Sequence, residues 1–349
     1  MDFVKVTPDT KNLPIALQFL AEHCAALGAS IYLDNAFHYV GYIERQDKKR
    51  FPFKGTAYGL NPFGASEIAR DKNYAGHLLH NAGLPCPDSI LIHSSSSIST
   101  IEQQNPRIAK KLKNEDQAIE FAQQNGWPVF VKPNDGSQGR GVSQVNSEKE
   151  LLSALQSLLT TNDCALVQQR KKGRDFRVLV LDDKVKLVVE RAPLSLTGDG
   201  QATISQQLEE IHDSPKGTSL FKAHGQIIEK HLRTQALSPS CVLERGQTIQ
   251  VLPNSNLSTG GTAVDQTDHL SSALKELALQ AAQCIGLRYA GVDLMVPELD
   301  SAVNEASILE INAAPGLNYF ARSTAKNFER CRQIYREVLE ALLESERGA

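Results

Sequence analysis

Apolar residues follow two periods along this chain, and together they predict a mixed α/β or α+β protein. Segments in which apolar residues recur every three or four positions have the spacing of one helix face. They predict helices near 13–27, 66–82, 114–125, 147–159, 270–285 and 325–343. Short runs rich in β-branched and aromatic residues predict strands near 30–33, 38–43, 129–132, from 142, 165–167, 290–296 and 308–311.

Residues that are typical of helix ends occur at several of the predicted helix boundaries. Gly28, Gly126 and Gly286 stand directly after predicted helices, where glycine allows the left-handed conformation that closes a helix. Asn114 followed by Gln117 has the spacing of a capping box, which satisfies free N–H groups at a helix start. By contrast, residues 194–265 are irregular and polar, with one helix expected near 203–212.

A β-hairpin is expected at residues 176–191, turning at Asp182-Asp183. A two-residue turn there pairs position 177 with 188 and position 191 with 174. Because side chains alternate along a strand, Arg191 then lies on the buried face and Arg177 on the opposite, mixed face. A bulge or twist near Asp175 is the alternative that would bring both arginines to one cleft. The predicted buried face also contains Phe176, Val178, Val180, Val185, Leu187 and Val189.

Length and charge narrow the class of protein. The 349 residues suggest two domains or one body with lobes, and the 41% of hydrophobic residues suffice for a sizeable core. A formal net charge of −3 favours neither nucleic acid nor an anionic membrane as a partner.

The six cysteines are scattered without a Cys-x-x-Cys pair, so neither a zinc site nor a disulfide framework is indicated. The start of the chain has no signal-peptide pattern and no apolar run reaches membrane-spanning length, so a cytoplasmic protein is expected.

The stretch Ile308-Leu-Glu-Ile-Asn-Ala-Ala-Pro-Gly316 carries the first candidate chemistry. Glu310 and Asn312 are two residues apart on a predicted strand and therefore face the same side. Asp293 lies on another short predicted strand. Hard oxygen ligands of this kind suit Mg²⁺. The competing interpretation is that Glu310 and Asn312 simply face solvent on a half-exposed strand.

A glycine-rich loop, Asp135-Gly-Ser-Gln-Gly-Arg-Gly141, follows Lys132 and lies between two predicted strands. Glycines let a backbone approach a phosphate closely. The loop is not a P-loop, because no Gly-Lys-Ser/Thr triplet opens a helix, and it does not have the dinucleotide-binding order of glycines. In protein kinases the loop precedes the strand lysine, whereas here it follows. An ordinary flexible hairpin is the alternative to nucleotide binding.

These motifs resemble, in order and spacing, those of the ATP-grasp ligases. The resemblance covers about residues 66–320 and is carried by Lys132 with the glycine loop, Gly173-Arg-Asp-x-Arg177, Glu190-Arg191, Gly291-Val-Asp293 and Glu310-Ile-Asn312. It is closest to the ATP-grasp modules of cyanophycin synthetases and of bifunctional glutathione synthetases. The fold implied is two lobes that clasp ATP, with residues 1–65 as a short N-terminal segment, 66–170 as the small lobe and 171–349 as the C-terminal lobe.

The resemblance also implies roles for individual residues. ATP would be bound by Lys72, Lys132, Gly136, Ser137, Gly139, Gly141, Gln168, Gln169 and Asp175. Asp293, Glu310 and Asn312 would hold Mg²⁺, with Mn²⁺ as the alternative ion. Arg177, Arg191 and Asn312 would be catalytic. The amino-acid substrate would meet Asn256, Ser258, Thr259, Gly260 and Gly261.

Two departures from the family pattern stand out. Gln168 occupies the position where these ligases usually have a glutamate at the adenine edge, which puts nucleotide choice in question. The chain also lacks the Mur-ligase-like half of cyanophycin synthetase, so it is not expected to perform both halves of that polymerisation.

The activity implied is ATP-dependent amide or peptide bond formation between amino acids or short peptides through an acylphosphate. A non-catalytic nucleotide-binding module and a small-molecule kinase are the alternatives, and a homodimer is left open. We expect Arg191→Ala to abolish ligation at wild-type stability or better, because the charge would be unpaired without ligand. Arg177→Ala is expected to lose less activity.

Overall fold

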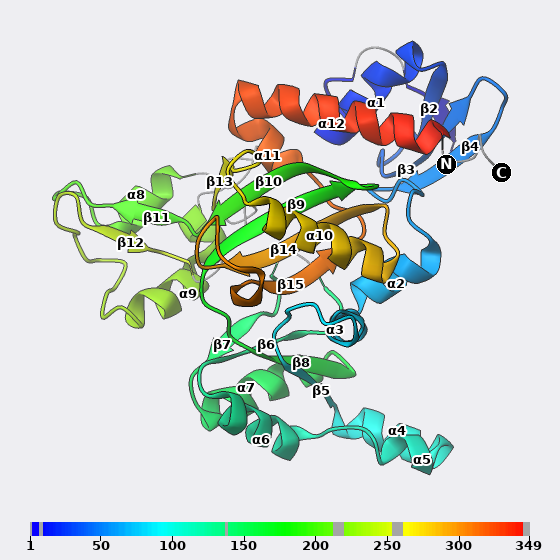
Figure 1. The fold of residues 1–349 in the computed structure, drawn as a ribbon. Coiled ribbons are helices and arrows are strands. Elements are labelled where there is room, and N and C mark those ends of the chain that lie inside the picture. The colour runs from blue at the N-terminus through cyan, green and yellow to red at the C-terminus, as the bar shows by residue number, and fades with distance from the viewer. Residues whose placement is uncertain (1, 7–9, 137–138, 212–219, 253–260, 345–349) are drawn as a thin grey trace.

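A computed structural model describes residues 2–6, 10–136, 139–211, 220–252 and 261–344. A five-stranded sheet lies in the middle of the molecule, with the sheet of the N-terminal segment at one end and a second four-stranded sheet at the other (Figure 1). A smaller unit with two strands projects from the side of the central sheet. Among the helices that the structure describes, none combines the length and hydropathy of a membrane-spanning segment.

The N-terminal sheet packs against helices from both ends of the chain. Its antiparallel strands are β1 (Phe3–Lys5), β2 (Ala29–Asp34), β3 (Val40–Arg45) and β4 (Arg50–Lys54), in that order. Helices α1 (Ile15–Ala26), α11 (Asn318–Ser323) and α12 (Ala325–Glu344) share its core. Alternation along the strands buries Ile31, Leu33, Ile43, Phe51 and Phe53. The predicted helices near 13–27 and 325–343 are confirmed.

The second four-stranded sheet carries the glycine-rich loop. Its order is β5 (Ser89–His93), β8 (Cys164–Gln169), β6 (Val129–Pro133), β7 (Ser143–Val145), and all neighbours are antiparallel. Helices α6 (Glu115–Asn125) and α7 (Glu148–Leu159) bury Ala118, Ala122, Leu151 and Leu155 against it. The capping box at Asn114 is confirmed. Helices α4 (Ser95–Gln104) and α5 (Pro106–Ala109) lie beyond α6 at the far end of the molecule (Figure 1).

The central sheet supplies most of the polar residues discussed below. Its order is β13 (Thr262–Asp265), β10 (Lys184–Ala192), β9 (Arg174–Leu181), β14 (Tyr289–Val296), β15 (Ser307–Asn312), again antiparallel throughout. Helix α10 (Ser272–Ile285) covers one face and ends at Gly286, whose φ of +84° only glycine adopts readily. The short 3₁₀ turn η2 (Val303–Glu305) leads into β15.

The register of the β9–β10 hairpin differs from the prediction. A β-bulge between Val185 and Leu187 adds one residue to β10, so Arg177 pairs with Val189 and Arg191 pairs with Asp175. Such an insertion moves every later side chain of the strand to the other face. The predicted placement of the two arginines on opposite faces is therefore wrong, and both lie on one face.

The predicted apolar face of this hairpin is wrong for Leu187 and Val189, for the same reason, whereas Phe176, Val178, Val180 and Val185 do share one core. Phe176, Val178 and Val180 share a core with Val188 and α10. Leu187 and Val189 instead join Leu179 in the core beneath α12 and the N-terminal sheet. Both faces of the hairpin are thus apolar over part of their length, and the arginines stand at the end of one of them.

The single helix predicted near 66–82 is two helices, α2 (Phe63–Arg70) and α3 (Lys72–Asn81). Asp71 between them is extended, with φ −86° and ψ 102°, and its carboxylate accepts the N–H of Tyr74 at 2.9 Å. An aspartate that caps a new helix in this way also ends the previous one. The break places Lys72 in the first turn of α3.

The described residues 194–211 and 220–252 are more regular than predicted. They form β11 (Ser195–Thr197), α8 (Ile204–Glu210), α9 (Leu220–Arg233) and β12 (Thr248–Gln250) around a small separate core. Helix α8 corresponds to the helix expected near 203–212, whereas α9 was missed. The apolar residues of α9 that join this core, Ile228 and Leu232, are separated by charged residues and give a weak sequence signal.

We propose that the chain divides at residues 65 and 170 into an N-terminal segment and two lobes. Each of the three parts has its own sheet, which supports this division.

Candidate functional site

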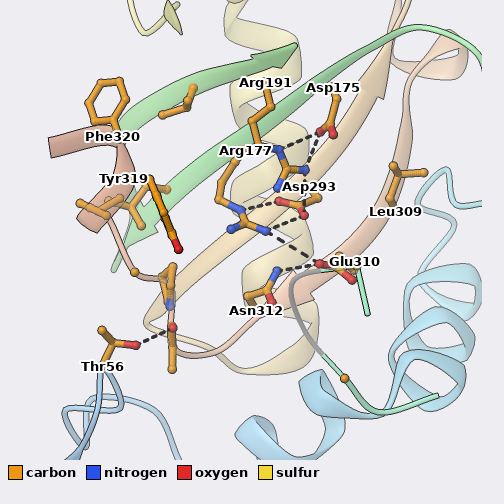
Figure 2. A pocket seen from close by; sticks show the side chains of 18 of the residues that line it. Thr56, Asp175, Arg177, Arg191, Asp293, Leu309, Glu310, Asn312, Tyr319 and Phe320 are labelled. Carbon is orange, nitrogen blue, oxygen red and sulfur yellow. Dashed lines mark hydrogen bonds and ion pairs between the residues drawn. The ribbon is translucent and has the colours of Figure 1, made fainter. Parts of the chain in front are cut away.

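Residues of the central sheet, of the second sheet and of loops in the N-terminal segment line a cavity of about 730 Å³. The second sheet contributes Lys132 and Gln168. The N-terminal segment contributes loops that carry Tyr39 and Thr56. The central sheet contributes the charged cluster drawn in Figure 2. A cavity of this size, with a few convergent polar groups, is typical of a small-molecule site.

Two arginines and two aspartates form the centre of this cluster. Asp293 stands opposite Arg177 on the neighbouring strand and accepts two parallel hydrogen bonds from it, both of 2.7 Å. Nη2 of Arg191 lies 3.0 Å from Asp293 Oδ2 and 2.5 Å from Asp175 Oδ1. The side chains of Arg191 and Asp293 are only 10% and 4% exposed, so these ion pairs are largely shielded from water.

The neighbouring charges set the pKa values of this cluster. Burial alone would raise the pKa of Asp293, but Arg177 and Arg191 outweigh it and lower the pKa to about 2. Burial, with the charge of Asp293 nearby, raises the pKa of Asp175 to about 6 although Arg191 opposes this. Burial opposes the charge of Arg191, but Asp293 and Asp175 outweigh it and raise the pKa of the guanidinium.

Glu310 extends the cluster along the next strand. It stands opposite Asp293 in the β14–β15 ladder and accepts a hydrogen bond of 3.2 Å from the side-chain amide of Asn312. The shared face predicted for Glu310 and Asn312 is confirmed by this contact. Arg177 and Lys72 lie 3.8 Å and 3.9 Å from the Glu310 carboxylate.

Two lysines face the same cavity from the other side. Lys132 is 8% exposed, and its ammonium donates a hydrogen bond of 2.7 Å to Oε1 of Gln168. Burial lowers the pKa of Lys132 to about 8, with Glu310 opposing this effect and Lys72 adding to it. Lys72 donates a hydrogen bond of 2.9 Å to the carbonyl of Gly136 and so contacts the glycine-rich loop.

The loop itself needs glycine at its later positions. Gly139 and Gly141 have φ values of +67° and +71°. A Cβ at Gly141 would also lie 3.0 Å from Pro133 Cγ and 3.1 Å from Leu158. The backbone conformation therefore excludes most side chains, which agrees with a loop whose N–H groups are presented to a ligand.

Two family profiles match the chain. The one described as D-ala D-ala ligase C-terminus matches residues 79–198, and the one described as RimK-like ATP-grasp domain matches residues 253–334. The first range contains the glycine-rich loop and both arginines, and the second contains Asp293, Glu310 and Asn312. The chain belongs to the ATP-grasp superfamily.

Curated relatives of this ATP-grasp protein include much longer proteins. The cyanophycin synthetases of Geminocystis herdmanii and Trichormus variabilis are 30% and 31% identical over 264 and 263 residues, which make up 72% of this chain and 28% and 27% of those proteins. The glutathione biosynthesis bifunctional protein of Listeria innocua is 30% identical over 199 residues, 54% of this chain and 26% of that protein. The chain thus spans less than a third of the length of these relatives.

A solved structure shows the same fold. The bifunctional glutathione synthetase from Pasteurella multocida superposes with a TM-score of 0.57 at 20% identity, covering 93% of this chain and 44% of that one. The predicted ATP-grasp fold is therefore confirmed, as a mixed structure of helices and antiparallel sheets.

The cavity of this ATP-grasp protein brings together most of the predicted site residues. Those that line it are Lys72, Lys132, Gly136, Gly139, Gln168, Gln169, Asp175, Arg177, Arg191, Asp293, Glu310 and Asn312. Gly141 and Gly261 are not among its lining residues. Ser137, Asn256, Ser258, Thr259 and Gly260 lie outside the described residues. The roles given to all of these residues remain predictions.

Sequence reasoning missed the part of the cavity that the ends of the chain provide. Leu17 at the start of α1, Tyr39 and Thr56 line it from the N-terminal segment, and Tyr319 and Phe320 line it from α11 (Figure 2). No motif marks the N-terminal residues. The aromatic pair Tyr319-Phe320, two residues beyond Pro315-Gly316, was the one available signal, because it follows the metal-binding candidates by only a few residues.

The oxygen donors at this site fit a hard cation. Asp293, Glu310 and Asn312 supply two carboxylates and an amide from neighbouring strands, and the Glu310 side chain is 29% exposed. Mg²⁺ is typically held by one or two protein carboxylates together with substrate phosphates. In the part of the chain that the structure describes, no group of three or more His, Cys, Asp or Glu residues forms a complete protein-only site. Two carboxylates and one amide oxygen are compatible with a site of that kind.

Proposed function

We propose that this ATP-grasp protein is an ATP-dependent carboxylate–amine ligase that forms an amide or peptide bond. The observation that carries the proposal is the composition of one cavity. It holds Lys72 and Lys132 beside the glycine-rich loop, and Arg177 and Arg191 beside the carboxylates of the central sheet. Cations on both sides suit a phosphate chain and an acid that meet between them.

The proposed reaction has two steps. An oxygen of the substrate carboxylate attacks the γ-phosphorus of ATP and ADP leaves, which gives an acylphosphate. The amine then attacks the acyl carbon, inorganic phosphate leaves and the amine gives up a proton. Such chemistry depends on positioning and charge neutralisation, and no side-chain nucleophile is required. In this scheme Lys72, Lys132 and the loop hold phosphates, and Arg177 and Arg191 stabilise charge at the transferring group.

The same proposal assigns the metal ligands and the nucleotide contacts. Asp293, Glu310 and Asn312 would hold Mg²⁺, or Mn²⁺ in its place, and the ion would supply positive charge next to the phosphates. Gln168 and Gln169 would contact the base, and Asp175 would lie toward the ribose side. Because Oε1 of Gln168 already accepts from Lys132, its NH₂ group is the part left for a nucleotide.

The names of the relatives suggest the substrate class. They make cyanophycin or glutathione, and a D-alanine–D-alanine ligase profile matches part of the chain. We therefore propose amino acids or short peptides as acid and amine, with Asn256, Ser258, Thr259, Gly260 and Gly261 as contacts of the amino-acid substrate. We further propose a cytoplasmic location, with neither nucleic acid nor membrane as partner.

The test is a screen of amino-acid and dipeptide pairs for release of ADP and inorganic phosphate, followed by product mass. A ligase requires both partners and gives a product that is lighter by one water than their sum. Phosphate release without an amide product would contradict the proposal. A phosphorylated product that accumulates without an amine would show a kinase, and binding of ATP without turnover across the screen would show a non-catalytic module.

The pKa of Lys132 predicts how nucleotide affinity depends on pH. Since burial lowers this pKa to about 8, the ammonium is lost as the pH rises through that value, and its attraction for phosphate is lost with it. A hydrogen bond to a charged group contributes about 1.5–3 kcal/mol, so the affinity for a non-hydrolysable ATP analogue should fall roughly tenfold or more between about pH 7 and 9.5. Calorimetric titration measures this.

The matched variants are Lys132→Gln and Lys110→Gln. Lys132→Gln should bind weakly and show little pH dependence above neutrality. Lys110 is exposed and lies outside the cavity, so its variant should keep the wild-type profile. A wild-type profile in Lys132→Gln would rule out Lys132 as the titrating group.

Nucleotide binding should also protect the glycine-rich loop from hydrogen exchange. A loop that contacts phosphates through its N–H groups must admit ATP first and then close over it. We expect slower exchange in peptides covering residues 134–141 after addition of an ATP analogue and Mg²⁺. Peptides from α12, which contributes no residue to the cavity, serve as the internal control. Unchanged exchange in the loop would count against its role.

A further inference from the structure

The loop of residues 313–317, directly after β15, is held in place by side chains of other segments. The ladder between β14 and β15 ends at Asn312, which pairs with Gly291. Beyond that pair, each of three successive backbone carbonyls accepts a hydrogen bond from a side chain. Asn61 Nδ2 donates to Ala313 at 2.7 Å, Thr56 Oγ1 to Ala314 at 2.8 Å, and the Tyr289 hydroxyl to Pro315 at 3.2 Å. Two of these donors belong to the N-terminal segment, which therefore helps to fix the 313–317 loop.

The 313–317 loop forms part of the cavity wall next to Arg177. Its residues 314–317 line the cavity, and Figure 2 shows the Thr56 hydroxyl directed at the loop. A Cβ atom at Gly291 would lie 3.1 Å from Pro315 Cβ and 3.6 Å from Arg177 Cδ, so Pro315 and Arg177 lie against the same residue of β14. A shift of the loop would therefore change the wall against which a group bound at Arg177 must fit.

Thr56 is suited to hold this loop because its own turn is fixed. Strand β4 ends at Lys54, and the N–H of Ala57 donates a hydrogen bond of 3.1 Å to the Lys54 carbonyl. The N–H of Gly55 donates one of 2.8 Å to the carbonyl of Tyr39, which ties the turn to the neighbouring loop of the N-terminal segment. The Thr56 side chain is partly exposed, so a substitution there does not disturb a packed core.

The 313–317 loop and the lysines of the cavity are held by different ends of the molecule. The sheet that carries Lys132 lies at one end and the N-terminal sheet at the other, with the central sheet between them (Figure 1). Under the proposed function, Lys72, Lys132 and the glycine-rich loop hold the phosphates. The acid would then lie on the other side of the arginines, which is the side of the 313–317 loop. Affinity for the acid should depend on this loop, whereas affinity for the nucleotide should not.

We infer that Thr56 is a positioning residue for the acid substrate. Its hydroxyl holds the 313–317 loop where the acid's carboxylate can lie beside Arg177 and Arg191. Asn61 acts on the same loop through Ala313. The inference rests on the proposed ligase function and gives the N-terminal segment a part in it.

The size of the expected effect follows from the strength of one hydrogen bond. Its net contribution corresponds to a factor of roughly three to ten in the equilibrium between the held and the displaced loop. Only protein with the loop in place binds the acid, so loss of the bond should raise KM for the acid by roughly that factor. The chemical step proceeds from the same bound state, so kcat should be unchanged.

Hydroxylamine tests the acid without knowledge of the natural amine. The carboxylate takes the γ-phosphoryl group from ATP with release of ADP. The nitrogen of hydroxylamine then attacks the acyl carbon, phosphate leaves and a proton is lost, which gives a hydroxamate that is measured by its iron complex. The acids are the standard amino acids and their N-glycyl dipeptides, and the best of them in the wild type is used for all variants.

Thr56→Val removes the hydroxyl and keeps the shape of the side chain. We expect it to raise KM for the acid, with kcat, the thermal unfolding midpoint and the affinity for a non-hydrolysable ATP analogue unchanged. Thr56→Ser keeps the hydroxyl and should restore the wild-type KM. Thr100→Val is the matched control, because the Thr100 hydroxyl also donates to a carbonyl, that of Ser96 at 2.9 Å, but it is exposed and lies outside the cavity. It should leave KM unchanged.

Asn61→Asp separates an effect through the loop from a direct contact with the acid. Asn61 does not line the cavity. The aspartate can still accept the N–H groups of Arg288 and Tyr289, but it cannot donate to the carbonyl of Ala313. We expect KM for the acid to rise in this variant as well, again without a change in affinity for the ATP analogue. A higher KM in Thr56→Val with a wild-type KM in Asn61→Asp would overturn the positioning role.

Failure of this inference and failure of the proposed function give different results. A wild-type KM in Thr56→Val, or equal losses of acid and ATP-analogue affinity together with a lower unfolding midpoint, would overturn the inference and leave the ligase function standing. Absence of both hydroxamate and acid-dependent ADP release from the wild type across the whole panel would overturn the ligase function, and the inference with it.

Discussion

Replacing Arg191 with alanine is expected to abolish ligation and to lower the free energy of unfolding by about 3–5 kcal/mol. The expected loss of stability is the opposite of the sequence-based expectation, which was wild-type stability or better because the charge of Arg191 was assumed to be unpaired without ligand. Nη2 of Arg191 lies 2.5 Å from Asp175 and 3.0 Å from Asp293, and its side chain is only 10% exposed. Removing it leaves two buried carboxylates that lack one of their partners. Denaturant unfolding measures the stability, and release of ADP and inorganic phosphate in the presence of both substrates measures the ligation.

Arg174→Ala is the matched control for this prediction. Arg174 begins β9, the partner strand of the same hairpin, and makes two hydrogen bonds of 2.8 Å to Glu190, but its side chain is 33% exposed and it does not line the cavity. Ion pairs at the surface contribute about 0–1 kcal/mol, and this pair is more exposed than that of Arg191, so the variant should remain active and lose much less stability than Arg191→Ala. Equal losses in the free energy of unfolding of Arg191→Ala and Arg174→Ala would show that burial does not make the ion pairs of Arg191 more important for stability.

The sequence-based expectation that Arg191→Ala loses more activity than Arg177→Ala is no longer supported. It rested on the two arginines facing opposite sides of the hairpin, and the bulge puts both next to Asp293. We therefore expect Arg177→Ala to lose activity to a similar degree.

Changing Glu310 to glutamine is expected to reduce turnover by roughly 100-fold or more while the fold is kept, because a bound metal contributes several kcal/mol to the barrier. A glutamine still offers an oxygen to accept the hydrogen bond that Asn312 now donates to Glu310. The substitution therefore mainly removes the negative charge of the Glu310 carboxylate, which would attract the metal. ADP release at saturating ATP and Mg²⁺ gives the activity, and Mn²⁺ binding in the presence of an ATP analogue gives the metal affinity.

Glu298→Gln provides the comparison. Glu298 is 71% exposed, lies outside the cavity and faces Arg174, so its variant should keep both turnover and Mn²⁺ affinity. Near-normal turnover of Glu310→Gln would remove Glu310 from the metal site. A loss of activity accompanied by unfolding would contradict the claim that the fold is kept, and thermal unfolding of both variants detects this.

Several features were decided by the sequence alone because they depend on residues that are close along the chain. A capping box needs only Asn114 and Gln117, and a helix end needs only Gly286. The shared face of Glu310 and Asn312 follows from the period of a strand, and their contact confirms it. The order and spacing of the motifs were sufficient to predict the ATP-grasp fold, and the comparisons confirm that prediction.

Other features were decided only by the tertiary structure, because they depend on residues that are far apart in the chain. Turn residues do not show where a ladder shifts by one residue, yet the bulge at 185–187 decides that Arg177 and Arg191 face Asp293 together. The low pKa of Lys132 depends on burial, which a sequence pattern cannot measure. The wall of the cavity also depends on distant residues, because Leu17 and Phe320, about three hundred positions apart, pack into one core beside it.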